Sequence, residues 1–249
     1  MTIHRDADKE AGNVFGQIIR RLCFKYELVV PVTIAPHSQR LFNQYYILPS
    51  KMLYNGWNVS HACIIVSPQT IAEVEKCKNT DKDRIIINLA RINEVKRQNV
   101  IAKGVDRLYK EGYSFTLIFV GNKRDEMIVN EINSYSCPLI HMLGEKTNPL
   151  EYLKLSDAYC LCSSYEGLPI SLIEALGVGV IPICTPVGGI VDVVSDGYNG
   201  ILSMSLSEED IYVSLKQFLD MPDEKLNHLK ANALKTYESY SMVECAKNY

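Results

Sequence analysis

Two glutamates eight positions apart, Glu166 and Glu174, carry the first chemical signal in the sequence. On a continuous helix they would lie about 12 Å apart, at about 1.5 Å of rise per residue. Carboxyl pairs that hydrolyse glycosidic bonds lie about 5–9.5 Å apart, so this spacing disfavours an acid–base pair. It suits two carboxylates that hold opposite ends of one extended, hydroxyl-rich ligand. For these two residues alone, an ordinary loop charge and an ordinary solvated helix charge remain the alternative.

A strand, a tight turn and a helix are predicted around these glutamates. Residues 158–162 form a short apolar run that is typical of a buried parallel strand. Apolar residues then recur at helical spacing through residues 168–176, and Pro169 suits a first helical turn because its missing N–H costs nothing there. In an open parallel sheet, such a turn lies at the carboxyl ends of the strands, where ligands bind. The N–H groups that would face an anion there belong to Leu168, Ile170 and Ser171.

Two cations follow another predicted strand, residues 84–90. Arg91 comes directly after this strand and Lys96 lies five residues further on, so both should emerge at the sheet edge that carries Glu166. An arginine binds phosphate oxygens in a bidentate fashion, and a lysine adds a point charge. A surface arginine and lysine after a strand are ordinarily solvated. Their position beside the glutamate turn instead predicts a site that stabilises a departing diphosphate.

The pattern around the glutamates resembles the donor site of a known enzyme family. Residues 166–176, residues 179–182 and the pair at 188–189 are similar to the signature of retaining glycosyltransferases of family four, which have an E-x7-E motif and the two-domain GT-B fold. The resemblance extends from about residue 4 to the end of the chain. It implies that Glu166 lies beside the donor sugar and that Glu174 binds the ribose of the nucleotide. It also implies donor contacts at Gly167, Leu168 and Ile170.

The same resemblance covers the two cations. Residues 88–99 resemble the family's strand–Gly-Arg–loop–Lys-Gly segment, in which Arg91 and Lys96 take the positions of the diphosphate-binding pair. Ala90 and Arg97 stand where the family usually has glycine. Alanine is a mild change unless the backbone φ is positive there. Arg97 leaves open which of the two neighbouring cations, Lys96 or Arg97, points inward.

Two further assignments rest on the resemblance alone. At the turn that includes Met142 and Leu143, the family's backbone pairs with the base of the nucleotide. His4 matches the place where many family members have a histidine that faces the donor sugar across the cleft. A histidine at a strand end with no role is the alternative interpretation for His4.

We expect an α/β protein of GT-B type, with a Rossmann-like parallel-sheet donor domain and a partial amino-terminal Rossmann-like domain. The predicted boundaries are residues 1–57 for the partial, acceptor-side domain, residues 58–240 for the nucleotide-sugar donor domain, and residues 241–249 for a tail that packs back on the first domain. The resemblance implies a truncated first domain, because family members normally begin with further βα units that carry a glycine-rich loop and most of the acceptor site. Strands are predicted at residues 28–35, 51–55, 84–90, 115–120, 138–143, 158–162 and 180–184, and helices at 13–26, 36–46, 100–110, 126–135, 150–155, 207–219 and 223–240.

Composition and charge exclude several classes of function. The net charge of −3 gives no general attraction to nucleic acid. The eight cysteines form no C-x-x-C or metal-ligand grouping with histidine. Asp81 and Asp83 flank a lysine in a connection before a predicted strand, which is not the usual metal-chelating D-x-D of a sugar-nucleotide site, so we expect no metal and no cofactor besides the nucleotide sugar. Cys160 and Cys162 lie in an apolar run and are expected to be buried thiols. No apolar run approaches the roughly 20 residues that span a bilayer. We expect a cytoplasmic protein, with the inner face of the membrane as an alternative place.

The predicted helix at residues 13–26 has an apolar face and a basic one. Two interpretations stay open: a helix packed on a sheet with a solvated basic rim, and a helix that contacts a membrane surface peripherally. We also expect residues 1–55 to show apolar surface that the missing βα units would cover, which favours self-association.

The expected function is transfer of a sugar from a nucleotide diphosphate sugar to a glycan or lipid-linked acceptor, with retention at the anomeric carbon, as in polysaccharide biosynthesis. A UDP-sugar is the commonest donor in the family. The alternative is a truncated remnant or partner subunit that binds nucleotide sugar without turnover. Because little of the acceptor half is expected here, we predict weak or no transfer by residues 1–249 alone. A nicotinamide dehydrogenase is excluded, since no G-x-G-x-x-G follows a first strand.

Overall fold

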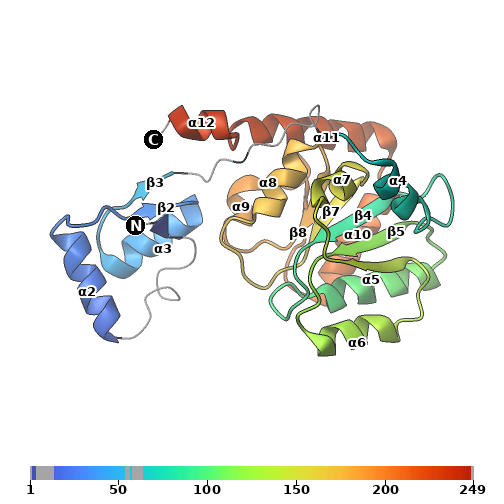
Figure 1. Ribbon diagram of the computed structural model, residues 1–249, viewed down its shortest axis with the longest axis horizontal. Helices are drawn as coiled ribbons and strands as arrows, with labels where there is room; N and C mark the ends of the chain where they lie inside the picture. The colour runs from blue at the N-terminus through green and yellow to red at the C-terminus, as the bar shows by residue number, and fades with distance from the viewer. Residues whose placement is uncertain (1, 4–13, 54–56, 58–63, 248–249) are drawn as a thin grey trace.

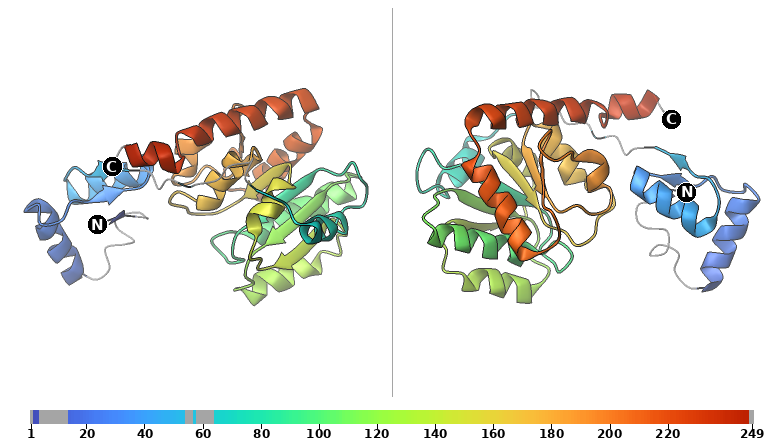
Figure 2. Two further views of the ribbon diagram at one scale, coloured as in Figure 1. Left: turned by 45° about the horizontal axis from the view of Figure 1, so that its top comes forward. Right: turned by 180° about the vertical axis from the view of Figure 1, so that it is seen from behind.

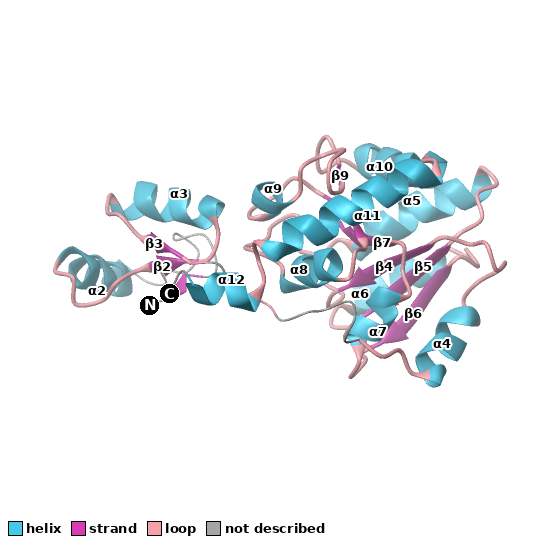
Figure 3. Ribbon diagram, turned by 90° about the horizontal axis from the view of Figure 1, so that it is seen from above, coloured by secondary structure: helices cyan, strands magenta, loops and turns pink. Residues whose placement is uncertain are grey.

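The computed structural model describes residues 2–3, 14–53, 57 and 64–247, and it contains two parallel sheets (Figures 1 and 3). The smaller sheet has three strands in the order β1-β2-β3, all parallel. Its elements in chain order are β1 (Thr2–Ile3), α2 (Val14–Lys25), β2 (Val32–Thr33), α3 (Pro36–Tyr46) and β3 (Lys51–Met52). We call this group of elements the amino-terminal unit.

The larger sheet has six strands in the order β6-β5-β4-β7-β8-β9, and every pair is parallel. Counted from its own first strand, this is the order 3-2-1-4-5-6 of dinucleotide-binding folds. The strand order therefore reverses between β4 and β7, and the loops that follow these two strands diverge to leave a crevice. The strands are β4 (Ile85–Leu89), β5 (Thr116–Val120), β6 (Ile140–Gly144), β7 (Ala158–Leu161), β8 (Ile181–Cys184) and β9 (Ile201–Leu202).

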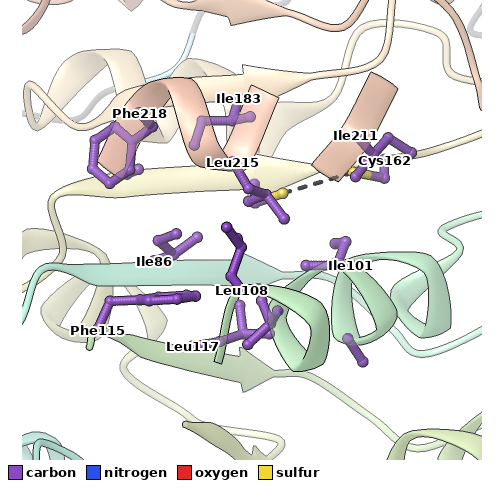
Figure 4. Close-up of a cluster of buried hydrophobic side chains, with 14 of the residues drawn as sticks. Ile86, Ile101, Leu108, Phe115, Leu117, Cys162, Ile183, Ile211, Leu215 and Phe218 are labelled. Carbon is purple, nitrogen blue, oxygen red and sulfur yellow. Dashed lines mark hydrogen bonds between the residues drawn. The ribbon is translucent and has the colours of Figure 1, made fainter. Parts of the chain in front are cut away.

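Helices cover both faces of the larger sheet, so its strands are apolar on both sides. Along β4, Ile86 packs in one buried cluster, while Ile85 and Ile87 pack in the other, as the two-residue repeat of a strand requires. The first cluster is covered by α5 (Gln98–Lys110), α6 (Glu126–Ser134) and α10 (Glu208–Asp220), and Figure 4 shows side chains of α5 and α10 meeting those of β4, β5 and β8. The second cluster is covered by α4 (Pro68–Glu75), α7 (Pro149–Lys154), α8 (Ile170–Gly177) and α9 (Ile190–Val193).

The last two helices connect the large sheet with the amino-terminal unit. The start of α11 (Asp223–Glu238) contributes to the first cluster through Leu226 and Leu229, and its later part contributes Ala233 to the second. Figure 2 shows α12 (Met242–Lys247) continuing from α11 toward the smaller sheet. The division of the chain into residues 1–57, 58–240 and 241–249 remains a prediction.

The predicted elements of the large sheet agree with the observed ones to within a few residues, but α4 was missed. A recognisable signal was present. The Ser67 side chain accepts the Thr70 N–H as an N-cap, and Pro68 opens the helix. In the amino-terminal unit, the strand predicted at residues 28–35 is observed only at Val32–Thr33. Each strand of the three-stranded sheet has two paired residues, so the apolar residues before and after β2 lie outside the paired segment.

The apolar face of α2 is exposed, which contradicts the interpretation of a helix packed on a sheet through that face. Val14 and Phe15 are each 71% exposed, and Ile18, Ile19 and Leu22 continue the same stripe. Phe24 is the buried residue of this helix and packs against Phe42 and Tyr46 of α3. We call residues 14, 15, 18, 19 and 22 the α2 stripe.

Asp192 of α9 joins the amino-terminal unit to the large sheet. Its carboxylate accepts the His37 N–H at 2.8 Å, in the first turn of α3, and pairs with Arg40 at 3.3 Å. The N-cap residue of α3, Ala35, has no side-chain acceptor, so Asp192 supplies one from α9.

In the part of the chain that the structure describes, no helix is long and apolar enough to cross a membrane. The seven cysteines described there are free, and Cys160 and Cys162 are buried as expected.

Candidate active site

The loops after β4 and β7 are tied together at the point where the strand order reverses. The Ser164 N–H donates to the Val95 carbonyl at 2.8 Å, and the Ser164 hydroxyl donates to the same oxygen at 3.3 Å. These bonds join segments that are about 70 residues apart in the sequence. They bring two loops together. One follows β4 and comprises residues 90–97, which we call the cation loop; the other follows β7 and comprises residues 162–169, which we call the glutamate turn.

Lys96 and Glu166 form an ion pair across these loops. The side chains of Lys96 and Glu166 are 20% and 10% exposed, so the pair is largely withdrawn from water. The Ser163 hydroxyl donates to the same Glu166 oxygen at 2.5 Å. A buried carboxylate needs such partners, because a lone buried charge is strongly disfavoured. Glu166 is therefore held in one orientation by a cation and a hydroxyl.

Side-chain amides hold the backbone of the cation loop in place. Asn93 Oδ1 accepts the Lys96 N–H at 3.0 Å. The fully buried Gln98 donates through Nε2 to the Arg91 carbonyl at 3.0 Å and to Asn88 Oδ1 at 3.3 Å. Because the loop backbone is fixed at both ends, the side chains of Arg91 and Lys96 project from a defined support.

The structure resolves which cation points inward. Arg97 adopts φ 54°, the left-handed region that favours the glycine usual at this position, and its guanidinium donates to the Leu206 carbonyl at 2.8 Å. Arg97 therefore turns away from the glutamate turn, and Lys96 turns toward it. Ala90 is not among the residues with positive φ, so alanine fits there without strain. Within the described residues, the Arg91 guanidinium has no hydrogen-bond or ion-pair partner.

A cavity of about 320 Å³ opens between these loops, and it contains both polar and apolar side chains. Arg91, Lys96 and Glu166 line it together, as the sequence predicted from their positions at one sheet edge. Gly167, Leu168 and Ile170 line it as well. Its remaining lining residues were not predicted from the sequence: Ile34, Asn93, Val95 and Tyr165.

Two glycines contact the backbone of the glutamate turn and fix its position. The Gly189 N–H donates to the Gly167 carbonyl at 2.7 Å, and a Cβ on Gly188 would stand 2.7 Å from the carbonyl carbon of Glu166. Gly188 also has φ 55°, which side-chain-bearing residues rarely adopt. The pair 188–189 is thus required for close backbone contact with Glu166 and Gly167.

Glu174 lies on α8, outside the lining of this cavity. Burial raises the pKa of its carboxyl group, and a hydrogen bond from the Trp57 side chain opposes that rise. The helix begins at Ile170 with Pro169 as its N-cap, so Glu166 precedes it and the spacing estimated for a continuous helix does not apply. The first-turn N–H groups of Ile170 and Ser171 have no backbone acceptor within the described chain.

The remaining predicted site residues lie elsewhere. Met142 and Leu143 are at the carboxyl end of β6, two strands from β4 at the same sheet edge, and they do not line the cavity. A register shift between Phe119 and Val120 creates an irregularity there. His4 lies outside the described residues. Among the residues that the structure describes, no three His, Cys, Asp or Glu side chains are grouped to hold a metal ion.

The model of the family "Glycosyl transferases group 1" matches residues 70–236, more than half of the chain. The chain therefore belongs to the glycosyl transferases group 1 family. The matched range contains Arg91, Lys96, Glu166 and Glu174.

Curated relatives of this chain include named glycosyltransferases of two bacteria. It is 25% identical over 176 residues to the N,N'-diacetylbacillosaminyl-diphospho-undecaprenol alpha-1,3-N-acetylgalactosaminyltransferase of Campylobacter jejuni, covering 69% of this chain and 44% of that protein. It is 27% identical over 179 residues to the O-antigen biosynthesis glycosyltransferase WbnH of Escherichia coli, covering 72% of this chain and 50% of that protein. The chain spans about half the length of these relatives.

Solved structures show the same fold. HepE from Anabaena, crystallised in complex with UDP, superposes with a TM-score of 0.83 at 16% identity, covering 99% of this chain and 69% of that one. The lipopolysaccharide outer core galactosyltransferase WaaB superposes with a TM-score of 0.69 at 18% identity, covering 88% and 60%. The GT-B fold class predicted from the sequence is confirmed.

Proposed function

We propose that this glycosyltransferase moves a sugar from a UDP-sugar to a glycan or lipid-linked acceptor, with retention at the anomeric carbon. The observation that carries the proposal is the cavity at the β4/β7 reversal, where the Arg91 guanidinium lies beside the Lys96–Glu166 pair and has no partner among the residues that the structure describes. Further support comes from the relatives named for lipid-linked and O-antigen glycans and from the UDP complex of HepE.

The proposed chemistry is mainly electrostatic. As the bond from the anomeric carbon to the diphosphate breaks, negative charge grows on the leaving oxygens. Arg91 binds these oxygens in a bidentate fashion, and the N–H groups at the start of α8 add their dipoles. An ammonium group has three protons, so Lys96 can keep its bond to Glu166 and still donate to a phosphate. Glu166 is then held beside the sugar. We propose that these groups carry the leaving diphosphate without a divalent metal.

The experiment that tests donor binding is calorimetry of the chain with UDP in the presence of EDTA. We expect binding, and we expect Arg91→Ala to weaken it by about 1.5–3 kcal/mol, because one charge-assisted contact to phosphate is lost. Arg97→Ala is the matched control: it removes the same charge from the same loop, but its guanidinium bonds to Leu206 and should leave UDP affinity within about twofold. No heat with UDP, GDP or ADP would contradict the proposal.

Substitutions of the two glutamates should have different effects in the same assay. We propose that Glu174 binds the ribose, so Glu174→Gln should weaken UDP and UDP-sugar alike. Glu166→Gln should leave UDP affinity nearly unchanged and reduce sugar recognition or turnover, because Glu166 is assigned to the sugar. Calorimetry with UDP and a UDP-sugar, followed by turnover with the UDP-sugar, makes the comparison. Equal weakening of UDP by both substitutions would show that the roles are wrongly assigned.

A binding protein without turnover is the second candidate function. Among the described residues that line the cavity, Ile34 is the one that comes from the amino-terminal unit. Transfer needs an acceptor held in near-attack geometry, which supplies about 7–11 kcal/mol of barrier reduction. A radiolabelled UDP-sugar distinguishes the candidates: release of labelled sugar or its transfer to a glycan supports the enzyme, and tight binding with neither supports the second.

The α2 stripe is proposed as a peripheral contact with an anionic membrane. Its apolar side chains are exposed, and Arg21 and Lys25 stand on the same helix. A helix with an apolar face and basic flanks lies in the headgroup region of bilayers that carry negative charge. Such a contact would hold the protein at a surface that can carry lipid-linked acceptors.

Ile18→Asp should abolish most of the binding to phosphatidylglycerol vesicles, since it places a negative charge within the stripe. Co-sedimentation with vesicles, measured at low and high salt, checks this. Met204→Asp is the control, because Met204 is 91% exposed and lies in the segment before α10, outside the stripe. Self-association of the wild-type chain that Ile18→Asp removes, with no vesicle binding in either form, would instead assign the stripe to contacts between copies.

A further inference from the structure

The first turn of α3 is capped by a side chain from the other part of the molecule. Ala35, the N-cap residue, has no side-chain acceptor, and Pro36 at the first helical position has no N–H. The first N–H that needs a partner is therefore that of His37, and it donates to Asp192 Oδ2 at 2.8 Å. A carboxylate at this end of a helix also faces the positive pole of the helix dipole. The cap lies 155 residues from the N–H that it accepts.

The Asp192 side chain is held by contacts on both of its oxygens and on its own backbone. The side chain is largely buried, and its second oxygen, Oδ1, pairs with Arg40 at 3.3 Å. Because the Arg40 side chain is largely exposed, this ion pair contributes little beside the buried cap. The Asp192 carbonyl accepts the hydroxyl of Tyr240, near the end of α11, at 3.4 Å. The carboxylate therefore projects from a segment that the large sheet and its helices hold in place.

The short helix α9 that carries Asp192 also contacts the glutamate turn. Its N-cap residue, Gly189, donates its N–H to the Gly167 carbonyl at 2.7 Å. A Cβ on Gly189 would stand 3.3 Å from the Cβ of Ala35 and would clash with the Gly167 oxygen. Figures 1 and 3 show α9 on the side of the large sheet that faces α3. One helical turn therefore connects the cap of α3 with the loop that carries Glu166.

The segment just before α3 forms part of the cavity wall. Ile34 and Ala35 are buried in the second apolar cluster, together with Ile190 and Val193 of α9. Among the described residues that line the cavity, Ile34 alone belongs to the amino-terminal unit. The place of Ile34 at the cavity therefore depends on how the start of α3 is held against α9.

We propose that Asp192 is a positioning residue: by capping α3, it holds the amino-terminal unit on the cavity and keeps Ile34 beside the donor sugar. This inference rests on the proposed function, which places a sugar in the cavity. Asp192 touches no reacting atom and acts through α3. The proposed partners of UDP, Arg91 and the N–H groups at the start of α8, belong to the large sheet's part of the chain. Loss of the cap should therefore impair reaction of the sugar and spare UDP binding.

Hydrogen exchange in the ligand-free chain tests the cap directly. We expect Asp192→Ala to speed exchange of the His37 amide about tenfold or more, the scale of one hydrogen bond to a charged group. Asp192→Asn keeps an acceptor oxygen but loses the charge, so the rate should rise only about threefold. Arg40→Ala removes the exposed ion pair alone and should change the rate less than about twofold. Unchanged exchange in Asp192→Ala would overturn the inference.

Turnover of a radiolabelled UDP-sugar tests the positioning role. We expect Asp192→Ala to lower kcat for release or transfer of the sugar by about 10–100-fold, because small displacements in a preorganised site are costly. UDP affinity by calorimetry should stay within about threefold of the wild-type value. Asp192→Asn should recover most of the turnover, since it retains the bond from His37.

Asp125→Ala is the matched control for a lost helix cap. Asp125 accepts the Met127 and Ile128 N–H groups at the start of α6, and none of these three residues lines the cavity. Its loss should lower stability to urea as much as loss of the α3 cap. Exchange at His37 and turnover should both stay at their wild-type values. An equal fall in turnover in Asp125→Ala would show that lost stability, and not positioning, explains the effect of Asp192→Ala.

The two readouts distinguish failure of this inference from failure of the proposed function. Faster exchange at the start of α3 with unchanged turnover in Asp192→Ala overturns the positioning role alone. A wild-type chain that neither releases nor transfers sugar from a UDP-sugar overturns the proposed function, and the positioning role with it.

Discussion

Gly188→Ala should destabilise the protein by at least about 3 kcal/mol and disrupt the candidate site. The residue has φ 55°, where a side chain costs about 1–2 kcal/mol. The added Cβ would also stand 2.7 Å from the Glu166 carbonyl carbon and closer still to its oxygen. These neighbours are backbone atoms, which cannot rotate away, so the turn that carries Glu166 must shift. Losses of this size in single variants come from such strain at special backbone positions.

Urea unfolding measures this effect, with UDP calorimetry as the readout of the site. Gly197→Ala is the matched control: it has φ 70°, but a Cβ there meets nothing within 4 Å. It should cost about 1–2 kcal/mol from backbone conformation alone and leave UDP binding unchanged. A Gly188→Ala protein as stable as the Gly197→Ala protein would show that the glutamate turn moves easily, and that the contact with Gly188 is not what positions Glu166.

Lys96→Met should destabilise the free protein by about 2–4 kcal/mol and slow turnover of a UDP-sugar by about 10²–10³-fold. The first effect arises because Glu166 would remain largely buried without its cation, retaining only the Ser163 hydroxyl. The second arises because a preorganised charge beside the departing diphosphate is lost. Methionine fills most of the lysine's volume, so packing changes little.

The double variant Lys96→Met/Glu166→Gln separates the two effects. Removing both charges should restore most of the stability, while turnover should stay low because neither charged group is present. Lys103→Met is the control, since Lys103 pairs with Glu208 where both side chains are about half exposed, and it should leave stability nearly unchanged. If Lys96→Met also has no more effect than this control, the Lys96–Glu166 pair does not hold the turn.

The α/β order and the meeting of Arg91, Lys96 and Glu166 could be predicted because both depend on local patterns and one general rule. Apolar runs of four to six residues alternate with helical spacing, and the carboxyl ends of parallel strands share an edge. The cation choice could not be predicted. Whether Lys96 or Arg97 faces inward depends on the backbone at residue 97, which is left-handed here despite its side chain.

Other parts of the site depend on contacts between distant residues, and no local pattern indicates them. The bonds from the Ser164 N–H and hydroxyl to the Val95 carbonyl join residues 69 positions apart. Ser163 lies three residues before Glu166, so a contact between them is easy to imagine. A serine hydroxyl can bond many different partners, however, and the sequence does not indicate that this one bonds Glu166. The exposure of the α2 stripe could not be predicted from the sequence either, because periodicity identifies an apolar face without indicating what covers it.

The link between Asp192 and α3 has a consequence for the order in which the chain can fold. As the chain leaves the ribosome, α3 appears about 155 residues before the carboxylate that accepts the His37 N–H. Ala35 provides no side-chain cap, so the first turn of α3 lacks this acceptor until α9 has been made. The amino-terminal unit therefore gains this stabilising contact late in synthesis. The amino-terminal unit is translated first, but the capping of α3 is complete only after α9 of the large sheet's part of the chain has been made.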